Sequence, residues 1–191
     1  MKINVELNQK SIQNAVNILK QTKKIVAEKM IPEYIQRSIQ WIEKEANRIV
    51  QSSDIGDNIK QYIQNSWVIE KVSNSHYMLK NISRHAVFVE FGVGIIGQTE
   101  QHPNADNAKY EYNVDSEHKF GQGFWQFTVE NQSELDLPDE AIINQTYTSE
   151  NGLTVITQGT KGVWFLFNAV ENFKLKERKR LWEEIKGKYL G

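Results

Sequence analysis

Two residues that can do acid–base or metal chemistry lie close together in the middle of the chain. Glu90 falls near the end of the apolar run Ala86–Phe91, and His102 follows after a glycine-rich stretch. A carboxylate there can act as a general base if its pKa is raised and a substrate lies within hydrogen-bond reach. Together with His85, the pair could ligate a hard or borderline metal ion. The sequence therefore allows a metal-dependent hydrolase that uses Glu90 and His102.

The same carboxylate has structural interpretations. A buried carboxylate without partners is costly, so we expect Glu90 to accept hydrogen bonds from the backbone of the Gly92–Gly94 turn or to pair with an arginine. It can also lie in a contact between subunits. None of the four histidines has H-E-x-x-H or other tight ligand spacing. A structural role is therefore favoured, and no catalytic residue, metal or cofactor is predicted.

Other catalytic motifs are missing or lack their context. Gly92, Gly94 and Gly97 have the G-x-G-x-x-G spacing, but a dinucleotide-binding loop opens a helix in a βαβ unit and no helical pattern follows here. The chain contains no cysteine, which excludes disulfides, thiol catalysis and thiolate metal sites.

The order of hydrophobic patterns predicts an α+β fold in a single domain, residues 1–191. Two amphipathic helices, separated at Pro32, open the chain, an antiparallel sheet follows, and a helix ends it. The predicted segments are a strand and two helices (2–52), the sheet (53–160) with long loops at 92–108 and 130–145, and a C-terminal helix packed on the sheet (162–189).

The sheet is predicted from short runs of alternating or β-branched residues. These runs are Trp67–Val72, His76–Asn81, Ala86–Phe91, Tyr110–Asn113, Phe124–Val129, Thr146–Thr148 and Leu153–Thr157. Short turns join the first three, which favours an antiparallel meander, and Asn151-Gly152 favours a hairpin between the last two. A short helix is expected around Ile59–Ile63.

The net charge and the lack of long apolar runs indicate which kinds of partner are not expected to bind the chain as a whole. The net charge of −1 excludes a strong overall attraction to nucleic acid or anionic lipid. No run approaches the ~20 apolar residues of a membrane helix, so we expect a cytoplasmic protein without membrane contact.

Two segments are strongly charged. Glu130–Glu140 holds five acids and no base and is expected to be solvated. A basic stretch could contact DNA phosphates, although nearby glutamates favour a solvated helix face. Its members are Lys174, Lys176, Arg178, Lys179 and Arg180.

Short motifs, taken in order, resemble one known family. They are Asn65-Ser66-Trp67, Asn81-x-Ser83-x-His85-Ala86, Val89-Glu90-Phe91-Gly92, His102-Pro103, and Gly159–Ala169 with its ending Phe165-Leu166-Phe167-Asn168-Ala169. Together they resemble the minor tail-component family of tailed bacteriophages, whose members are tail-completion or head–tail joining proteins of the virion neck. The resemblance covers about residues 50–172. It departs at Val93, where the family usually has threonine.

The resemblance implies an architectural protein rather than an enzyme, made in the host bacterial cytoplasm and carried in the neck of a phage or prophage virion. Its implied partners are other copies in a ring, a head-completion protein, and the tail terminator or tail tube. The residues implied to hold the structure are Asn65, Ser66, Trp67, Glu90, Phe91, Gly92, Gly94, His102, Pro103, Phe167, Asn168 and Ala169. On this interpretation Glu90 ties the end of its strand to the glycine turn, and the 92–108 loop reaches a neighbouring subunit through Val93, Ile95, Ile96 and Gly97.

Overall fold

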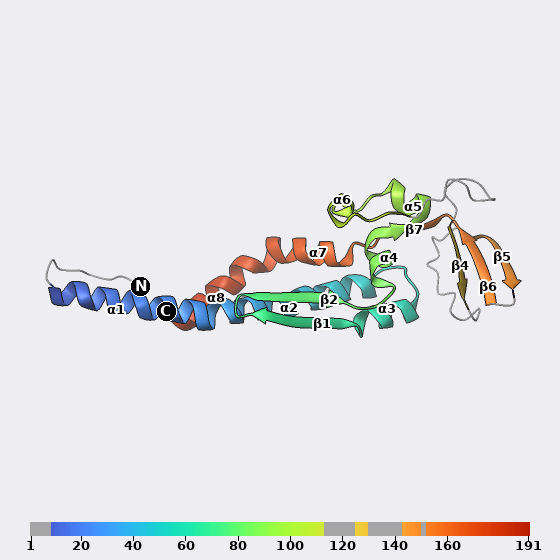
Figure 1. The fold of residues 1–191 in the computed structure, drawn as a ribbon. Coiled ribbons are helices and arrows are strands. Elements are labelled where there is room, and N and C mark those ends of the chain that lie inside the picture. Colours follow the sequence, from blue (N-terminus) through green and yellow to red (C-terminus); the bar gives the residue numbers. More distant parts are fainter. Residues whose placement is uncertain (1–8, 113–124, 130–142, 150–151) are drawn as a thin grey trace. The chain divides into compact units, whose positions relative to one another are not determined.

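The computed structural model describes residues 9–112, 125–129, 143–149 and 152–191 (Figure 1). They form helices and small antiparallel sheets, so the α+β fold class is confirmed. The helices are α1 (Gln9–Ile25), α2 (Ile31–Gln51), α3 (Asp57–Gln64), α4 (Ala86–Phe91), α5 (Gly94–Thr99), α6 (Ala105–Ala108), α7 (Phe165–Asn172) and α8 (Arg178–Leu190), with π-helical turns η1 (Val26–Met30) and η3 (Phe173–Glu177). The strands are β1 (Trp67–Ser73), β2 (His76–Asn81), β3 (Gly92–Val93), β4 (Trp125–Val129), β5 (Ile143–Ser149), β6 (Gly152–Thr157) and β7 (Gly159–Lys161).

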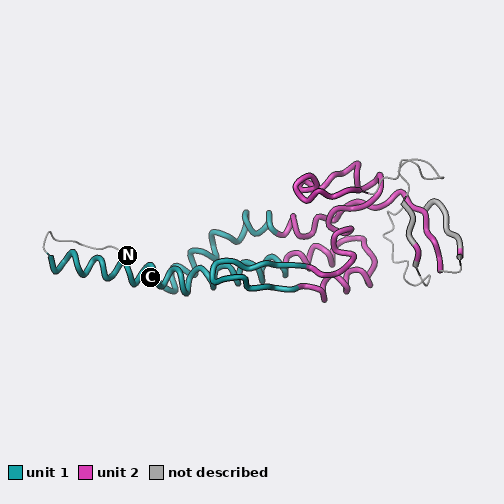
Figure 2. The backbone as a smooth tube through the Cα atoms, in the orientation of Figure 1, with its two compact units in different colours: residues 1–44, 68–80, 170–191 teal, residues 45–67, 81–169 magenta. Residues whose placement is uncertain are grey.

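The chain divides into two compact units, each built from segments distant in sequence (Figure 2). Unit 1 comprises residues 1–44, 68–80 and 170–191, and unit 2 comprises residues 45–67 and 81–169. All four divisions fall within helices or strands, namely α2, β1, β2 and α7, rather than in linkers. The single domain expected from the sequence therefore stays a prediction.

The N-terminal helices follow one another without a break, although the sequence predicted a separation at Pro32. Proline has no amide hydrogen, and its ring clashes with the carbonyl four residues earlier in an α-helix. The wider turn η1 lies directly before it, where the amide of Ile31 donates to the carbonyl of Val26, five residues back. Such a π-turn is one way in which a helix absorbs a local disruption. The strand predicted in residues 2–8 lies outside the described residues.

Unit 1 has an apolar core formed by its helices. Met30, Phe173, Leu181 and Ile185 form one buried cluster. Aromatic side chains surround it, and the ring of Tyr34 meets that of Trp182 edge-on at 5.5 Å. The two π-turns thus each supply a core residue, Met30 from η1 and Phe173 from η3.

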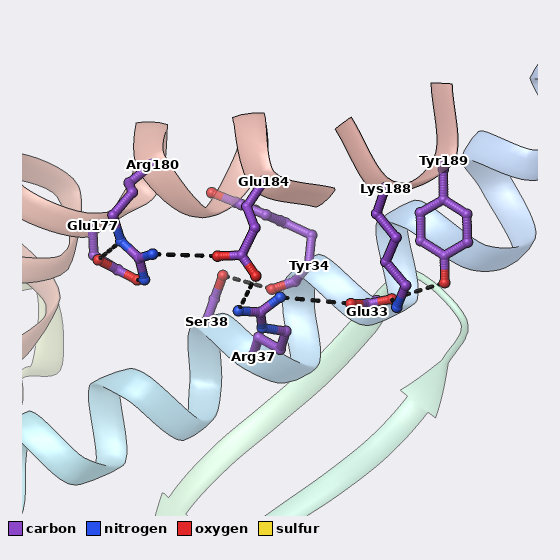
Figure 3. Close-up of polar contacts among 9 residues, drawn as sticks. All are labelled: Glu33, Tyr34, Arg37, Ser38, Glu177, Arg180, Glu184, Lys188 and Tyr189. Atoms are coloured by element: carbon purple, nitrogen blue, oxygen red, sulfur yellow. Dashed lines mark hydrogen bonds and ion pairs between the residues drawn. The ribbon is translucent and has the colours of Figure 1, made fainter. Parts of the chain in front are cut away.

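Ion pairs join α2 and α8 beside this core (Figure 3). Arg37 contacts Glu184 at 2.8 Å, and Glu33 receives both Lys188 at 2.7 Å and the hydroxyl of Tyr189 at 2.8 Å. The hydrogen bonds from Lys188 and Tyr189 lower the pKa of the Glu33 carboxyl below its ordinary value. The C-terminal helix therefore combines a buried apolar face with a charged edge.

The strand predicted at Ala86–Phe91 is wrong, because this run forms helix α4. Ala86, Phe88 and Glu90 alternate as in a strand, but the buried residues are Ala86, Val89 and Glu90, which have helical spacing. A run of six residues fits either period, so pattern alone could not decide. The predicted three-stranded meander is consequently reduced to the hairpin β1–β2.

The remaining strands divide between two sheets. Strands β4, β6 and β5 form an antiparallel sheet in that order, which confirms the strands predicted around Phe124–Val129, Thr146–Thr148 and Leu153–Thr157. The 92–108 segment is not a loop, since it contains β3, α5 and α6, and β3 pairs with β7. No strand is found at Tyr110–Tyr112. Of the predicted 130–145 loop, only Ile143–Gln145 lies among the described residues, and it belongs to β5.

Candidate functional site

Glu90 lies near the end of α4 in unit 2 and is only 7% exposed. The helix ends at Gly92, whose φ of +80° turns the chain into β3. The backbone carbonyl of Glu90 accepts a hydrogen bond from the amide of Trp164 at 3.2 Å, and that of Val89 accepts one from the amide of Val163 at 2.7 Å. These bonds place the Glu90 side chain beside the start of α7.

The Glu90 carboxylate caps the N-terminus of α7. Its Oε2 accepts from the amide of Leu166 at 2.8 Å, and its Oε1 accepts from the amide of Phe167 at 2.9 Å. The first amides of a helix lack partners within the helix, and a negative charge is favourable at that end. Trp164, the residue just before α7, has no side-chain acceptor with which to cap it. Glu90 therefore supplies from α4 what an N-cap serine or aspartate usually supplies locally.

His102 completes the carboxylate's set of partners. Its Nε2 lies 3.0 Å from Oε1 of Glu90, and its Nδ1 accepts a hydrogen bond from the amide of Asn104 at 3.0 Å. A ring nitrogen that accepts carries no proton, so in the neutral ring the proton is on Nε2 and is donated to Glu90. Both ring nitrogens are occupied in this arrangement.

Aromatic rings surround the Glu90–His102 pair. The His102 ring lies 4.4 Å from that of Phe91 and 5.2 Å from that of Phe167, measured between centroids. The hydroxyl of Tyr112 accepts from the amide of His102, and the hydroxyl of Tyr110 donates to the carbonyl of Gly92. Burial and the neighbouring Tyr112 raise the pKa of Tyr110 to about 12, so it stays a neutral donor. The pair is thus enclosed by side chains rather than open to a substrate.

Glycines allow β3 and β7 to approach closely beside this cluster. A Cβ on Gly92 would lie 2.6 Å from the carbonyl oxygen of Thr160, and one on Gly159 would lie 1.8 Å from that of Val93. Both residues have positive φ, which side chains resist. The positive φ and the close approach to β7 therefore explain why glycine is required at Gly92.

The geometry favours a structural role for Glu90. The structure does bring Glu90 and His102 together, as a metal-dependent hydrolase would require. However, the carboxylate already has three donors, and neither nitrogen of His102 has a free lone pair. His85 instead stacks on Tyr62 at 5.6 Å between ring centroids. Within the described residues, no three His, Asp or Glu side chains are grouped to hold a metal ion.

The prediction of the hydrogen-bond donors to Glu90 was wrong, and its actual donors were not predicted. We expected the Gly92–Gly94 turn or an arginine, but the donors are the α7 amides and His102. The prediction began this helix at residue 162, and only its observed start at Phe165 shows that Trp164, the residue before it, cannot cap it through its side chain. Trp164 itself has a φ of +55°, and its buried Nε1 has no acceptor among the described residues.

The earlier motifs form backbone turns in the same unit. Asn65 ends α3, and the carbonyl of Ser66 accepts from the amide of Ile82 at 2.9 Å. The indole of Trp67 donates to the side-chain oxygen of Asn47 at 2.7 Å and meets Phe165 edge-on at 6.1 Å. Asn81, Ser83 and His85 are linked by successive side-chain-to-backbone hydrogen bonds. These residues thus shape the backbone.

The predicted contact residues of the 92–108 segment are only partly accessible. Val93 is 3% exposed, and Gly97 is also buried, so neither can meet a neighbouring subunit. Ile95 is exposed, and Ile96 is half-buried. Of the four predicted contact residues, only Ile95 and Ile96 are therefore accessible. Of the closing signature, Asn168 donates to the carbonyl of Val163, and Ala169 is fully buried.

No family model, curated protein or solved structure gives a significant match to this chain. Among the described helices, none is both long and apolar enough to cross a bilayer.

Proposed function

We propose that this chain is a structural component of a tailed phage or prophage virion, a tail-completion or head–tail joining protein. It assembles as a ring, or on one, in the neck, after synthesis in the host cytoplasm. Its partners are other copies and the neighbouring neck and tail proteins, such as a head-completion protein and the tail terminator or tube. No catalytic step is part of the proposal.

One observation carries the proposal: a single buried carboxylate joins three of the motifs on which the family resemblance depends. Glu90 belongs to Val89–Gly92, His102 to His102-Pro103, and the capped amides to Phe165–Ala169. These motifs are distant in sequence, yet their residues meet in one cluster. Short patterns that matched by chance would not be expected to meet in one cluster. Their meeting therefore supports the resemblance to an architectural family.

The chemistry of the cluster also supports this proposal over hydrolysis. A general base needs a substrate within hydrogen-bond reach. The Glu90 oxygens already accept from two helix amides and face His102, and aromatic rings enclose the pair. A group held in this way stabilises the fold and is poorly placed to move a substrate proton.

Disruption of the gene in an inducible lysogen tests the proposal. After induction we expect DNA-filled heads and unjoined or malformed tails in electron micrographs, with a large loss of infectious particles. Expression of the intact chain from a plasmid should restore infectious particles, which controls for effects on neighbouring genes. Normal particles from the disrupted lysogen would refute the proposed function.

A further inference from the structure

The basic stretch around the start of α8 contains two kinds of cation. Lys174 pairs with Glu171 at 2.6 Å. Arg180 is held by Glu177 and Glu184, which Figure 3 shows on the same side of the helix. A cation that is already paired with carboxylates contributes little to binding a further anion. Lys174 and Arg180 are therefore poor candidates for contacting a partner.

Arg178 and Lys179 differ from these two residues. Both are exposed, and neither side chain forms an ion pair or hydrogen bond with another residue in the described part of the chain. Together with Tyr34 and Trp182 they line an open hollow of about 370 Å³ in unit 1. Because Arg178 and Lys179 lie one helical turn before Trp182 on α8, their side chains reach the same face of the helix.

The hollow combines charge with apolar surface. Tyr34 and Trp182 form an edge-to-face pair with ring planes at 89°. Leu175, in the preceding turn η3, is 81% exposed. Duplex DNA offers rows of phosphates, and an exposed leucine and two aromatic rings add nothing to phosphate binding. A protein segment that is both acidic and apolar fits these residues better.

We propose that this hollow binds the acidic segment Glu130–Glu140 of a second copy of the chain. The segment contains five acids and no base, and its sequence E-L-D-L-P-D-E, residues 134–140, places Pro138 and two leucines among carboxylates. Aromatic side chains in a groove can pack against proline rings, as in the grooves that bind proline-rich segments. The carboxylates that flank Pro138 suit the unpaired Arg178 and Lys179.

This inference rests on the proposed function, because it gives a way for neighbouring subunits to join. The hollow and the acidic segment are different parts of the same chain. A contact between different surfaces is head-to-tail, and repeated head-to-tail contacts close into a ring when the rotation permits. The proposed contact thus provides a chemical basis for a ring.

Peptide binding to the full-length chain tests the proposal. A fluorescein-labelled peptide of residues 130–143 is titrated with wild-type chain, with R178E/K179E and with K23E/K24E, and anisotropy is recorded. The control places the same charge change on exposed lysines of α1. We expect wild type and control to bind equally and R178E/K179E to bind at least about tenfold more weakly, since like charges in a contact are strongly unfavourable.

A charge exchange separates a specific contact from general attraction. A peptide with Asp136→Lys and Asp139→Lys should bind R178E/K179E better than it binds wild type. Circular dichroism of R178E/K179E should match wild type, because neither cation has a partner within the described residues. Equal peptide binding by wild type and R178E/K179E, or no binding by wild type, would overturn the proposal. So would a duplex DNA oligonucleotide that binds the hollow more tightly than the peptide.

Sedimentation velocity shows which copy supplies the segment. We expect wild type to self-associate as its concentration rises, and R178E/K179E to stay monomeric at the same concentrations. A wild type that binds the peptide but stays monomeric throughout would overturn the second-copy proposal in favour of docking within one chain. If the disrupted lysogen yields unjoined heads while the peptide does not bind, this inference fails and the proposed function stands. Peptide binding together with normal particles would mean that the contact exists and that the proposed function fails.

Discussion

In unit 1, Glu33 and Glu184 lie at the edge of a helix pair and meet long, partly exposed basic side chains. Glu33 binds Lys188, and Glu184 binds Arg37, beside an aromatic core. In unit 2, Glu90 is buried and meets two backbone amides and one imidazole. Glu33 and Glu90 thus place the same chemical group in different environments, one partly exposed and one buried.

The difference shows where an acidic residue matters most. Exposed ion pairs gain little, because water and salt screen them and long side chains lose freedom. A buried carboxylate is costly to leave unpaired, and so are the amides it satisfies. A substitution at Glu90 should therefore cost much more than the same substitution at Glu33.

The largest expected effect is that of Glu90→Ala. It leaves the amides of Leu166 and Phe167 and the Nε2 of His102 without an acceptor in a buried place. We expect a loss of about 3–5 kcal/mol in the free energy of unfolding. Urea unfolding measures the loss, and hydrogen exchange should show it first at the start of α7.

Glu90→Gln is the matched control for size, because the amide keeps one acceptor oxygen but loses the charge. It should lie between wild type and Glu90→Ala. Surface changes usually alter the free energy of unfolding by no more than about 0.5 kcal/mol. If Glu90→Ala and Glu90→Gln both stayed within that range of wild type, the contrast between Glu90 and Glu33 would be lost. That result would also reopen a non-structural role for Glu90.

The second prediction compares two glycines. Gly92 has a φ of +80° and lies against the backbone of β7, whereas a Cβ on Gly187 in α8 would meet nothing within 4 Å. Gly92→Ala should lower the free energy of unfolding by about 2 kcal/mol or more, through strain and a backbone clash. Gly187→Ala should raise it by about 0.5–1 kcal/mol, because alanine is the better helix former.

Thermal unfolding of both variants tests whether the two changes in stability have opposite directions. A lower midpoint for Gly92→Ala and a higher one for Gly187→Ala are expected. Equal shifts in one direction would mean that the close approach of β3 and β7 does not constrain unit 2.

The sequence predicted those elements whose signal is local. The long helical periods on either side of Pro32 and the Asn151-Gly152 turn identify α1, α2 and the β5–β6 hairpin, because spacing and turn chemistry act over a few residues. Helix α4 was missed because six residues, Ala86–Phe91, satisfy both periods. No local rule separates the two interpretations.

The site was predicted in part for a similar reason. The sequence singled out Glu90 and His102 and favoured a structural role, but it could not identify the donors. Leu166 lies 76 residues beyond Glu90, and a backbone amide leaves no mark on the residue type. The tautomer of His102 likewise depends on the amide of Asn104, which only the folded chain brings into place.

The smallest expected effect is that of Glu33→Gln, which makes the same chemical change in unit 1. At neutral pH we expect a loss of about 0.5 kcal/mol or less, as is usual for ion pairs near the surface. High salt should reduce this loss further, because the Debye length falls to about 3 Å at 1 M. The loss from Glu90→Gln should change much less with salt, because burial limits screening. Urea unfolding at low and high salt compares the two variants directly.

The contribution of Glu33 to stability should also depend on pH, in a direction set by its lowered pKa. The hydrogen bonds from Lys188 and Tyr189 hold the pKa of Glu33 below its ordinary value, so the carboxylate stabilises the folded chain at and above that value. As the pH falls below about 4.3, the usual glutamate pKa, the contribution decreases, and it is lost once the pH passes through the lowered folded-state pKa. Wild type and Glu33→Gln should therefore differ at pH 7 and converge in acid, as measured by urea unfolding across that range. A difference that stayed constant into acid would mean that the Lys188 and Tyr189 contacts do not favour the ionised carboxylate, and the contrast with unit 2 would then rest on Glu90 alone.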